Sequence, residues 1–356
     1  MARAMKAAYL KKPGASIEVI DVPEPELRSG GIIVSIQAAP VLSFMRKVVS
    51  GELGYSMATP WIPGANGVGV VETVADDVVG IQRGQRVFID PHIHTHTNTD
   101  TYDGILIGLT ALSPHSAPLQ QQWRHGTFAQ KALIPAECLT MVPDDLSDPE
   151  RLSILSFAAI AYGGLVKGGF RSGQTLIVSG ATGNIGSCAV LVGLALGAKR
   201  VVALGREEGV LERVRALDPK RVKAVRLTGD FEADKQSVAA ITGGADLVYD
   251  ILGNVPSFEP TAAAIYALRR GGAAVLMGGV QAAMNLPYSY IMLNEISIQG
   301  AFMYPRSAPR ELLNMVAAGT LDLSKPEIRS FPLGGVVAAL NHAESVRGPS
   351  YTVLVP

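Results

Sequence analysis

Three glycines lie where an apolar, strand-like run gives way to a helical one. Gly180, Gly183 and Gly186 stand in the segment SGATGNIG, between TLIVS and CAVLVGLALG. Gly180 suits a tight turn with a positive φ, and Gly186 suits close packing of the helix on the strand. The helix start offers amide donors and a positive dipole end to a pyrophosphate. The spacing departs by one residue from G-x-G-x-x-G, but strand, turn and helix still predict dinucleotide binding by Gly180, Thr182, Gly183, Asn184, Ile185 and Gly186. The alternative is a glycine-rich turn without this ligand.

The end of the next strand-like run bears on which dinucleotide is bound. RVVALG ends at Gly205 and is followed by Arg206, where a site for NAD usually carries an acidic residue that binds ribose hydroxyls. A cation suits a 2′-phosphate, so Gly205 and Arg206 predict NADP(H). In the alternative interpretation Arg206 is solvated at a helix start, and the neighbouring Glu207 reaches a ribose.

A parallel sheet is needed to position these residues. From about Leu155 to Tyr304, strand-like runs (TLIVSG, RVVALG, ADLVYDI and GGAAVLMGG) alternate with segments of helical length. This alternation is typical of βαβ units, which form a parallel sheet that binds ligands beyond the carboxyl ends of its strands. We therefore predict a Rossmann-type, doubly wound domain over residues 157–303.

The two ends of the chain have a different pattern. Runs such as MKAAYL, GGIIVSIQAA and GVGVVETVADDV lie between Gly, Pro and Asp, which predicts short strands of a barrel-like β domain. Residues 92–125 are rich in Thr, Ser, Gln and Pro and are predicted to be mostly loop, with one helical turn. After a helix over about 308–318, strand patterns return in PEIRSFPLGG and YTVLVP. The fold class is thus α/β, with a β domain (1–156 and 304–356) interrupted by the nucleotide-binding domain.

Composition limits the classes of function. The 356 residues carry 31 Lys and Arg against 31 Asp and Glu, and this zero formal charge argues against nucleic-acid binding. Two cysteines, Cys138 and Cys188, are too few for a disulfide framework and suit a reducing compartment. No signal peptide is evident, and the uncharged stretch 172–198 divides into strand, turn and helix rather than forming a membrane span. We expect a cytoplasmic protein with a small-molecule substrate and no nucleic-acid or membrane partner.

Several landmarks resemble the medium-chain dehydrogenase/reductase superfamily. They are MKAAYL, IPGANGVGVVETVADDVVGIQRGQRV, GTFAQKALIP, SGATGNIG and NEISIQG, and they extend over nearly the whole chain. The resemblance implies a GroES-like β domain, a Rossmann domain, hydride transfer from a nicotinamide and, in many members, a homodimer joined through the Rossmann sheets. Placement in the family also implies that backbone groups approach the nicotinamide at Gly278, Gly279, Val280, Ala301, Phe302 and Met303.

The chain departs from the zinc alcohol dehydrogenases of that superfamily at their metal ligands. Those enzymes carry a Cys after the third strand, a G-H-E motif, and a third ligand before the Rossmann domain. The corresponding positions here are Leu42 in APVLSFMR, Ala65 and Asn66 in PGANG, and about Leu155. Leucine and alanine have no lone pair for zinc, so no catalytic metal is predicted. These segments are more similar to the quinone oxidoreductase and enoyl reductase branch.

A site without zinc favours one type of reduction. Carbonyl reduction concentrates negative charge on one oxygen, whereas conjugate reduction spreads it over a longer system and demands less of the protein. We therefore predict reduction of an activated C=C bond, as in an enone or enal, or of a quinone. Two alternatives stay open: an alcohol dehydrogenase or carbonyl reductase with hydrogen-bond donors in place of zinc, and a non-catalytic NADP-binding structural or sensor protein.

The resemblance also suggests which side chains meet the substrate. Ser43, Tyr55 and Asn66 are the candidate catalytic donors, and the proton comes from Tyr55 or from water. The alternatives are that Tyr55 is an ordinary loop residue and that Asn66 braces the PGANG turn. Four aromatic residues are predicted to line the substrate pocket or to belong to the core: Phe44, Trp61, Trp123 and Tyr162.

The segment HIHTH has the appearance of a metal cluster. Alternation along a strand would place His92, His94 and His96 on one face, and imidazole suits zinc, copper or nickel. No familiar ligand spacing accompanies these histidines, so we interpret the segment as a polar loop and predict no metal.

Overall fold

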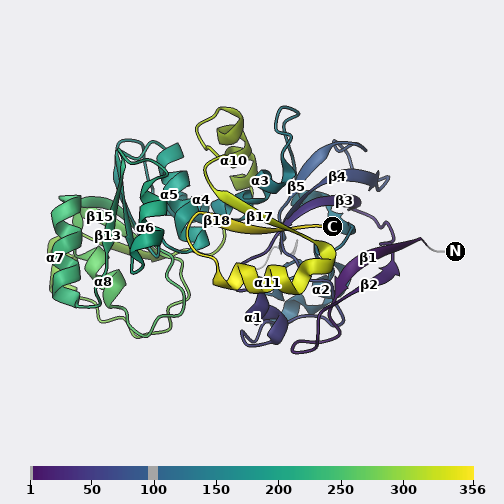
Figure 1. Ribbon diagram of the computed structural model, residues 1–356, viewed down its shortest axis with the longest axis horizontal. Coiled ribbons are helices and arrows are strands. Elements are labelled where there is room, and N and C mark those ends of the chain that lie inside the picture. Colours follow the sequence, from purple (N-terminus) through teal and green to yellow (C-terminus); the bar gives the residue numbers. More distant parts are fainter. Residues whose placement is uncertain (1–2, 95–102) are drawn as a thin grey trace. The chain divides into compact units, whose positions relative to one another are not determined.

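The protein is described here by a computed structural model, covering residues 3–94 and 103–356 (Figure 1). Contacts between Cα atoms divide the chain into two compact units. The first runs up to Ser156 and includes Ile328–Val346 and Tyr351–Pro356, while the second comprises Phe157–Glu327 and Arg347–Ser350. The sequence pattern assigned everything from residue 304 onward to the first unit. Helix α10 (Ala308–Ala317) instead belongs to the second.

A mainly antiparallel sheet forms the framework of the first unit. Its central strand, β3 (Gly31–Pro40), pairs with β4 (Gly67–Val74), with β9 (Lys131–Pro135) and with β18 (Ser350–Val355). The sheet continues through β5 (Arg86–Ile89) to β10 (Leu139–Met141) on one side and through β17 (Glu327–Pro332) on the other. A hairpin of β1 (Ala4–Tyr9) and β2 (Glu18–Pro23) completes the strands predicted from the alternating runs.

The segment predicted to be mostly loop is more regular than expected. Within its described part, β6 (His92–His94), β7 (Gly104–Leu106) and β8 (Thr110–Ala111) form a small antiparallel sheet. Helix α2 (Ala117–Gln122) follows and is the predicted helical turn. The loop prediction was wrong for these strands because the run GILIGLTAL folds back on itself at Gly108, where φ is +67°, and this reversal leaves no alternating pattern.

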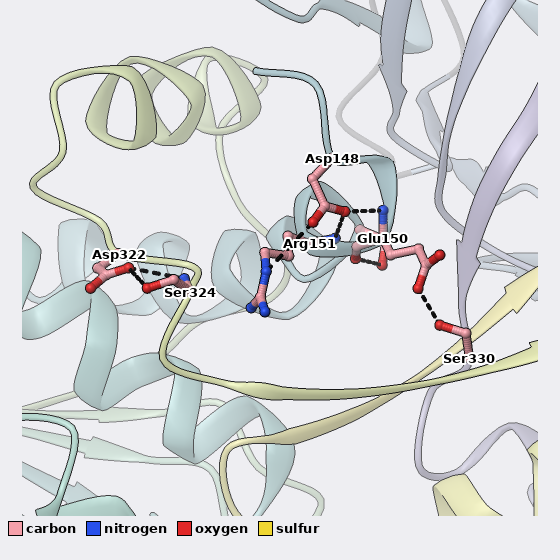
Figure 2. A network of polar contacts seen from close by, with 7 residues as sticks. Asp148, Glu150, Arg151, Asp322, Ser324 and Ser330 are labelled. Carbon is pink, nitrogen blue, oxygen red and sulfur yellow. Dashed lines mark hydrogen bonds and ion pairs between the residues drawn. The ribbon is translucent and has the colours of Figure 1, made fainter. Parts of the chain in front are cut away.

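Short helices with specific caps connect the strands of the first unit. The Asp148 side chain accepts hydrogen bonds from the backbone N–H groups of Glu150 and Arg151, both at 3.1 Å, and so begins α3 (Pro149–Ser153) (Figure 2). The Glu150 carboxylate in turn accepts a hydrogen bond from Ser330 of β17. Helices α1 (Met45–Ser50) and α11 (Val336–Ser345) are linked by an ion pair between Arg46 and Glu344.

The second unit contains the predicted parallel sheet. Its strands run in the order β13-β12-β11-β14-β15-β16, and each neighbouring pair is parallel. Their bounds are β11 (Thr175–Ser179), β12 (Arg200–Gly205), β13 (Val222–Arg226), β14 (Ala245–Asp250), β15 (Leu268–Leu276) and β16 (Ser297–Gly300). The order reverses between β11 and β14, which confirms the doubly wound arrangement and locates its ligand crevice at the carboxyl ends of those strands.

Helices cover both faces of this sheet, as Figure 1 shows for α5 (Asn184–Ala195) and α6 (Glu208–Arg215) against α7 (Phe231–Thr242) and α8 (Glu259–Ile265). Ile177 of β11 packs in a core with residues of α7 and α8. Its neighbour Leu176 points the other way, toward Gly193 of α5. Helices α4 (Leu155–Lys167) and α9 (Tyr288–Leu293) complete the unit. Within the described residues, no helix has the length and apolar character needed to cross a membrane.

Candidate active site

The glycine turn has the backbone geometry predicted for it. Gly180 follows β11 with a φ of +84°, and the Gly183 N–H bonds to the Gly180 carbonyl at 3.0 Å. A Cβ atom on Gly186 would lie 2.0 Å from the Gly180 oxygen, so only glycine fits where the first turn of α5 crosses the loop. No described side chain caps this helix start. The turn therefore presents helix amides, without a competing side chain, to an anion.

The residues between these glycines divide into two groups. Thr182, Gly183 and Ile185 are half-buried and leave part of their surface open. The Asn184 side chain is buried and donates to the carbonyls of Gly348 and Ser350, at 3.3 and 2.8 Å. This amide holds the segment 347–350 against the turn, a contact over more than 160 positions that local sequence does not reveal.

The ends of the neighbouring strands are joined to the turn by backbone hydrogen bonds. The Ile251 N–H, just after β14, bonds to the Ser179 carbonyl at 3.1 Å, and the Gly279 N–H bonds to the Leu252 carbonyl at 2.8 Å. A Cβ on Gly278 would lie 2.2 Å from that same Leu252 oxygen. The structure thus brings Gly278 and Gly279 to the edge of the sheet that carries the glycine turn.

The third predicted nicotinamide segment follows β16. The Ala301 N–H bonds to the Leu276 carbonyl at 3.0 Å, and Met303 has a φ of +56°, a left-handed conformation that is uncommon for a residue with a side chain. Gly163 of α4 packs against it, since a Cβ there would lie 2.5 Å from the Met303 oxygen. Tyr162 precedes Gly163 in α4, and both burial and the charge of Glu311 raise its pKa.

Two arginines flank the carboxyl ends of β12 and β13. Arg206 is exposed directly after Gly205, and Arg226 is the Cα partner of Gly205 in the sheet and is also exposed. Sequence reasoning identified Arg206 and missed Arg226, whose position at the end of VKAVR becomes meaningful only once β13 is seen beside β12. Glu207, the other candidate for a ribose contact, is exposed at the start of α6.

The candidate proton donors of the first unit lie around α1. Ser43 and Phe44 are half-buried just before the helix. Tyr55 follows the helix in a loop, is 37% exposed, and has its pKa raised by partial burial. Among the described residues, no hydrogen bond joins Ser43, Tyr55 and Asn66, so the structure does not connect the three donors into one network.

Asn66 is tied into the PGANG turn. Its side-chain amide donates to the Ile89 carbonyl at 3.2 Å, and its own carbonyl accepts from the Thr127 hydroxyl at 2.6 Å. Gly64, with a φ of +105°, has no room for a Cβ because Phe128 and Thr127 approach it. The side chain is only 5% exposed, which favours its bracing function over contact with a substrate.

The positions that the sequence resemblance assigns to the metal ligands of the zinc enzymes carry buried hydrocarbon side chains. Leu42, Ala65 and Leu155 are 4%, 2% and 0% exposed and belong to the core of the first unit. None of these side chains carries a donor atom for a cation. The residues present therefore do not fit a catalytic zinc at this place.

The histidine segment is described in part. The rings of His92 and His94 lie 4.0 Å apart at their centroids, and the His92 N–H bonds to the Asp90 carboxylate at 3.0 Å. No group of three metal-ligating side chains occurs within 3–94 and 103–356. His96 lies outside the described residues, so the prediction that this segment binds no metal stays a prediction.

The aromatic candidates for a pocket are distributed over both units. Trp61 is fully buried, and its backbone pairs with Leu10 at 3.0 Å in each direction. Trp123 is 8% exposed and lies under the guanidinium of Arg28, which is 5.9 Å from its ring centre. Phe44 is in the same unit, whereas Tyr162 is in the second.

Comparison with known proteins agrees with this division. Residues 28–144 match the alcohol dehydrogenase GroES-like domain, and residues 184–318 match the zinc-binding dehydrogenase family. An alcohol dehydrogenase from Geobacillus stearothermophilus is 28% identical over 317 residues, which cover 88% of this chain and 89% of the relative. An acryloyl-coenzyme A reductase from Sulfurisphaera tokodaii is 26% identical over 322 residues, covering 89% and 90% of the two chains.

Solved structures share the fold at lower identity. A structure from Sinorhizobium meliloti 1021 bound to NADP is 22% identical, with a TM-score of 0.82 over 99% of this chain and 100% of its own. An alcohol dehydrogenase from E. coli CFT073 complexed with NADH is 20% identical, with a TM-score of 0.81 over 99% of each chain. Fold and glycine turn together define an oxidoreductase built from a GroES-like and a Rossmann domain, with a nicotinamide cofactor. The chain belongs to the medium-chain dehydrogenase/reductase superfamily, which confirms the resemblance noted in its sequence.

Proposed function

We propose that the protein is an NADPH-dependent oxidoreductase that works without a catalytic zinc and reduces an activated C=C bond, in an enone or enal, or a quinone. The observation that carries this proposal is that Leu42, Ala65 and Leu155, which the resemblance assigns to the positions of the zinc ligands, are buried and have only hydrocarbon side chains. With no cation at that place to stabilise an alkoxide, a substrate that delocalises the developing charge is favoured.

The proposed cofactor site consists of the glycine turn and the strand ends of the second unit. The pyrophosphate would lie over Thr182, Gly183 and Ile185, where the helix amides are free of a side-chain cap. The nicotinamide would lie near Gly278–Val280 and Ala301–Met303, at the ends of β15 and β16. A bound nicotinamide supplies the hydride; the protein's own residues hold the ring and exclude water.

Two cations support a preference for NADPH over NADH. Arg206 and Arg226 follow adjacent strand ends, next to the position where the ribose of the cofactor is bound in doubly wound sheets. Neither makes a described ion pair, so both guanidinium groups are available for a 2′-phosphate. NADP is bound in one structural neighbour and NADH in another, so the preference rests on these two side chains.

The candidate proton donors belong to the first unit. The raised pKa of Tyr55 keeps its hydroxyl protonated at neutral pH, so it can donate a hydrogen bond and then a proton to the reduced substrate, with water as the other source. Ser43 is a further candidate hydrogen-bond donor, whereas the amide of Asn66 already donates to the Ile89 carbonyl. Phe44 is the proposed apolar contact of the first unit, and Tyr162 stays a candidate of the second unit, whereas Trp61 and Trp123 are buried.

A carbonyl reductase or alcohol dehydrogenase is the second candidate. Its specific support is that an alcohol dehydrogenase is 28% identical to the chain, while the acryloyl-coenzyme A reductase, 26% identical, favours the first candidate. The test is NADPH oxidation with matched enones, quinones and saturated aldehydes. Turnover of the enones and quinones with no turnover of the aldehydes supports the proposal; the reverse pattern supports the second candidate.

We further propose a homodimer in the cytoplasm, with a small-molecule substrate as the other partner. Strand β16 ends the described sheet, and beside it α9 exposes Met292 and Leu293, at 56% and 66%. An open strand edge flanked by exposed apolar side chains suits pairing with a second copy. Light scattering on Leu293→Glu should show a shift from dimer to monomer; a wild-type monomer overturns this part.

A further inference from the structure

The first unit contains a cavity that is separate from the glycine turn and has Trp123 in its lining. It measures about 530 Å³, within the size range of small-molecule sites, and lies beside the β1–β2 hairpin and β9. Its apolar lining includes Met5, Ile20, Ile62 and Leu133, and its polar lining includes Arg28, Arg124 and His125. Every residue of the lining belongs to the first unit, so the cavity is complete there.

The two arginines of the cavity bring positive charge without a described counter-ion. The Nε atom of Arg124 is buried and has no hydrogen-bond partner. Arg28 donates from Nη1 to the Gln122 carbonyl at 2.9 Å and lies over the Trp123 ring, and no carboxylate within 3–94 and 103–356 forms an ion pair with either arginine. Arg28 is exposed and Arg124 is half-buried, so the cost of removing positive charge from water falls on the buried Nε of Arg124, and this favours an anion beside that atom.

His125 adds a third donor to the same place. The Ile62 N–H donates to its Nδ1 at 3.2 Å, so Nδ1 is an acceptor and the neutral ring carries its hydrogen on Nε2. Burial, together with the charges of Arg124 and Arg28, lowers the pKa of His125 to about 4. The ring is therefore neutral at physiological pH, and both guanidinium groups are close enough to act on it.

The acidic side chains of the lining do not neutralise this group. Glu24 is paired with Lys131 at 2.9 Å, and Asp21 with Lys6 at 3.3 Å. Glu26 is exposed to solvent, where its charge is screened. The cavity thus joins an apolar floor to three hydrogen-bond donors, two of them charged.

We propose that this cavity is a second ligand site, which binds a small organic carboxylate. The carboxylate accepts hydrogen bonds from Arg28, Arg124 and the Nε2–H of His125, and the hydrocarbon part of the ligand packs on Met5, Ile20 and Leu133. The site shares no residue with the glycine turn, so it stands whether or not the proposed function is correct.

The two tryptophans of the chain allow a direct test. The indole N–H signals of Trp61 and Trp123 are recorded by NMR during titration with benzoate, with the neutral isostere benzamide, and with inorganic phosphate. We expect benzoate to shift the Trp123 signal in a saturable way, to leave the fully buried Trp61 unchanged, and to raise the pKa of His125. No saturable shift with benzoate, an equal response to benzamide, or a response to phosphate alone would overturn the proposal.

Substitutions of the cavity arginines test whether benzoate binds in this cavity. Arg124→Gln should weaken benzoate binding about tenfold or more, whereas Arg83→Gln, the same change at an exposed arginine of this unit, should leave it unchanged. Arg28→Gln serves as the second variant and keeps the test decisive if Arg124→Gln does not fold. Equal affinity in the Arg28 and Arg83 variants, with their folds intact by circular dichroism, contradicts the assignment.

Discussion

The proposed cofactor site in the second unit and the proposed substrate site in the first unit differ in how they are built. At the glycine turn of the second unit the backbone conformation determines the site, because Gly180 has a positive φ and Gly186 has no space for a Cβ. Around α1 and PGANG in the first unit the side chains matter most, because the resemblance assigns Leu42 and Ala65 to metal-ligand positions and both are buried hydrocarbon residues. The cofactor site can therefore be predicted from the spacing of the glycines. The proposed reaction type depends instead on a few side chains within the same fold.

The largest effect is expected from a substitution in the glycine turn. Gly186→Ala places a Cβ 2.0 Å from the Gly180 oxygen, so it should cost about 3 kcal/mol of stability and abolish detectable NADPH binding. Calorimetry and dinucleotide titration measure both. Gly209→Ala, in α6 where the added Cβ meets nothing within 4 Å, is the control and should leave binding unchanged without lowering stability. Normal NADPH binding by the Gly186→Ala enzyme would contradict the requirement for glycine at this position of the turn.

A pH effect of similar size is expected in the first unit. The pKa of His125 is 6.5 when unfolded and about 4 when folded, so between these values the unfolded chain binds more protons. The free energy of unfolding should rise from pH 4 to pH 6.5, by at most about 3 kcal/mol, and be level above that for this group. In His125→Gln, whose side-chain oxygen can still accept from Ile62, denaturant melts should show this rise removed; an unaltered slope speaks against a buried neutral ring.

A smaller effect is expected for the preference for NADPH over NADH. Arg206→Ala should weaken NADPH binding by about 2 kcal/mol, roughly thirtyfold, and leave NADH binding unchanged, because only NADPH carries the 2′-phosphate. Arg226→Ala should act in the same direction. The exposed Arg171 of the same unit provides the control substitution, Arg171→Ala. Equal losses for NADPH and NADH in titrations would remove the preference.

The smallest effect tests the proton donor. Tyr55→Phe should lower kcat about tenfold and leave KM for NADPH unchanged, since water can still deliver the proton. The acid limb of the kcat profile should stay in place, because the raised pKa of Tyr55 keeps it protonated over that range. Tyr288→Phe, at a side chain that is 80% exposed, is the matched control. Unchanged kcat in Tyr55→Phe assigns the proton to water alone.

Periodicity and glycine spacing were enough to predict the parallel sheet, its ligand-binding edge and most strands of the β domain. Strand β13 was missed because Lys223 and Arg226 interrupt its apolar pattern, and α11 because it follows Gly334 and Gly335 among strand-like runs. The small sheet β6–β8 was missed because its pairing depends on a chain reversal rather than on alternation.

Side-chain functions were harder to predict than elements. Asn184 was assigned to the cofactor from its place in the turn, yet its amide binds carbonyls of a segment near the C-terminus. Asn66 likewise uses its amide on Ile89, in another strand. Such long-range contacts follow from the folded chain and leave no local signal, which is why the glycine positions were clearer than the polar ones.

The absence of zinc chemistry is the central claim, and metal content measured together with activity tests it most directly. Purified enzyme is dialysed against a strong chelator, and its zinc per chain and its NADPH-dependent turnover of an enone are measured before and after. We expect full activity with no stoichiometric zinc. One zinc per chain, whose removal abolishes turnover and whose return restores it, would contradict the account.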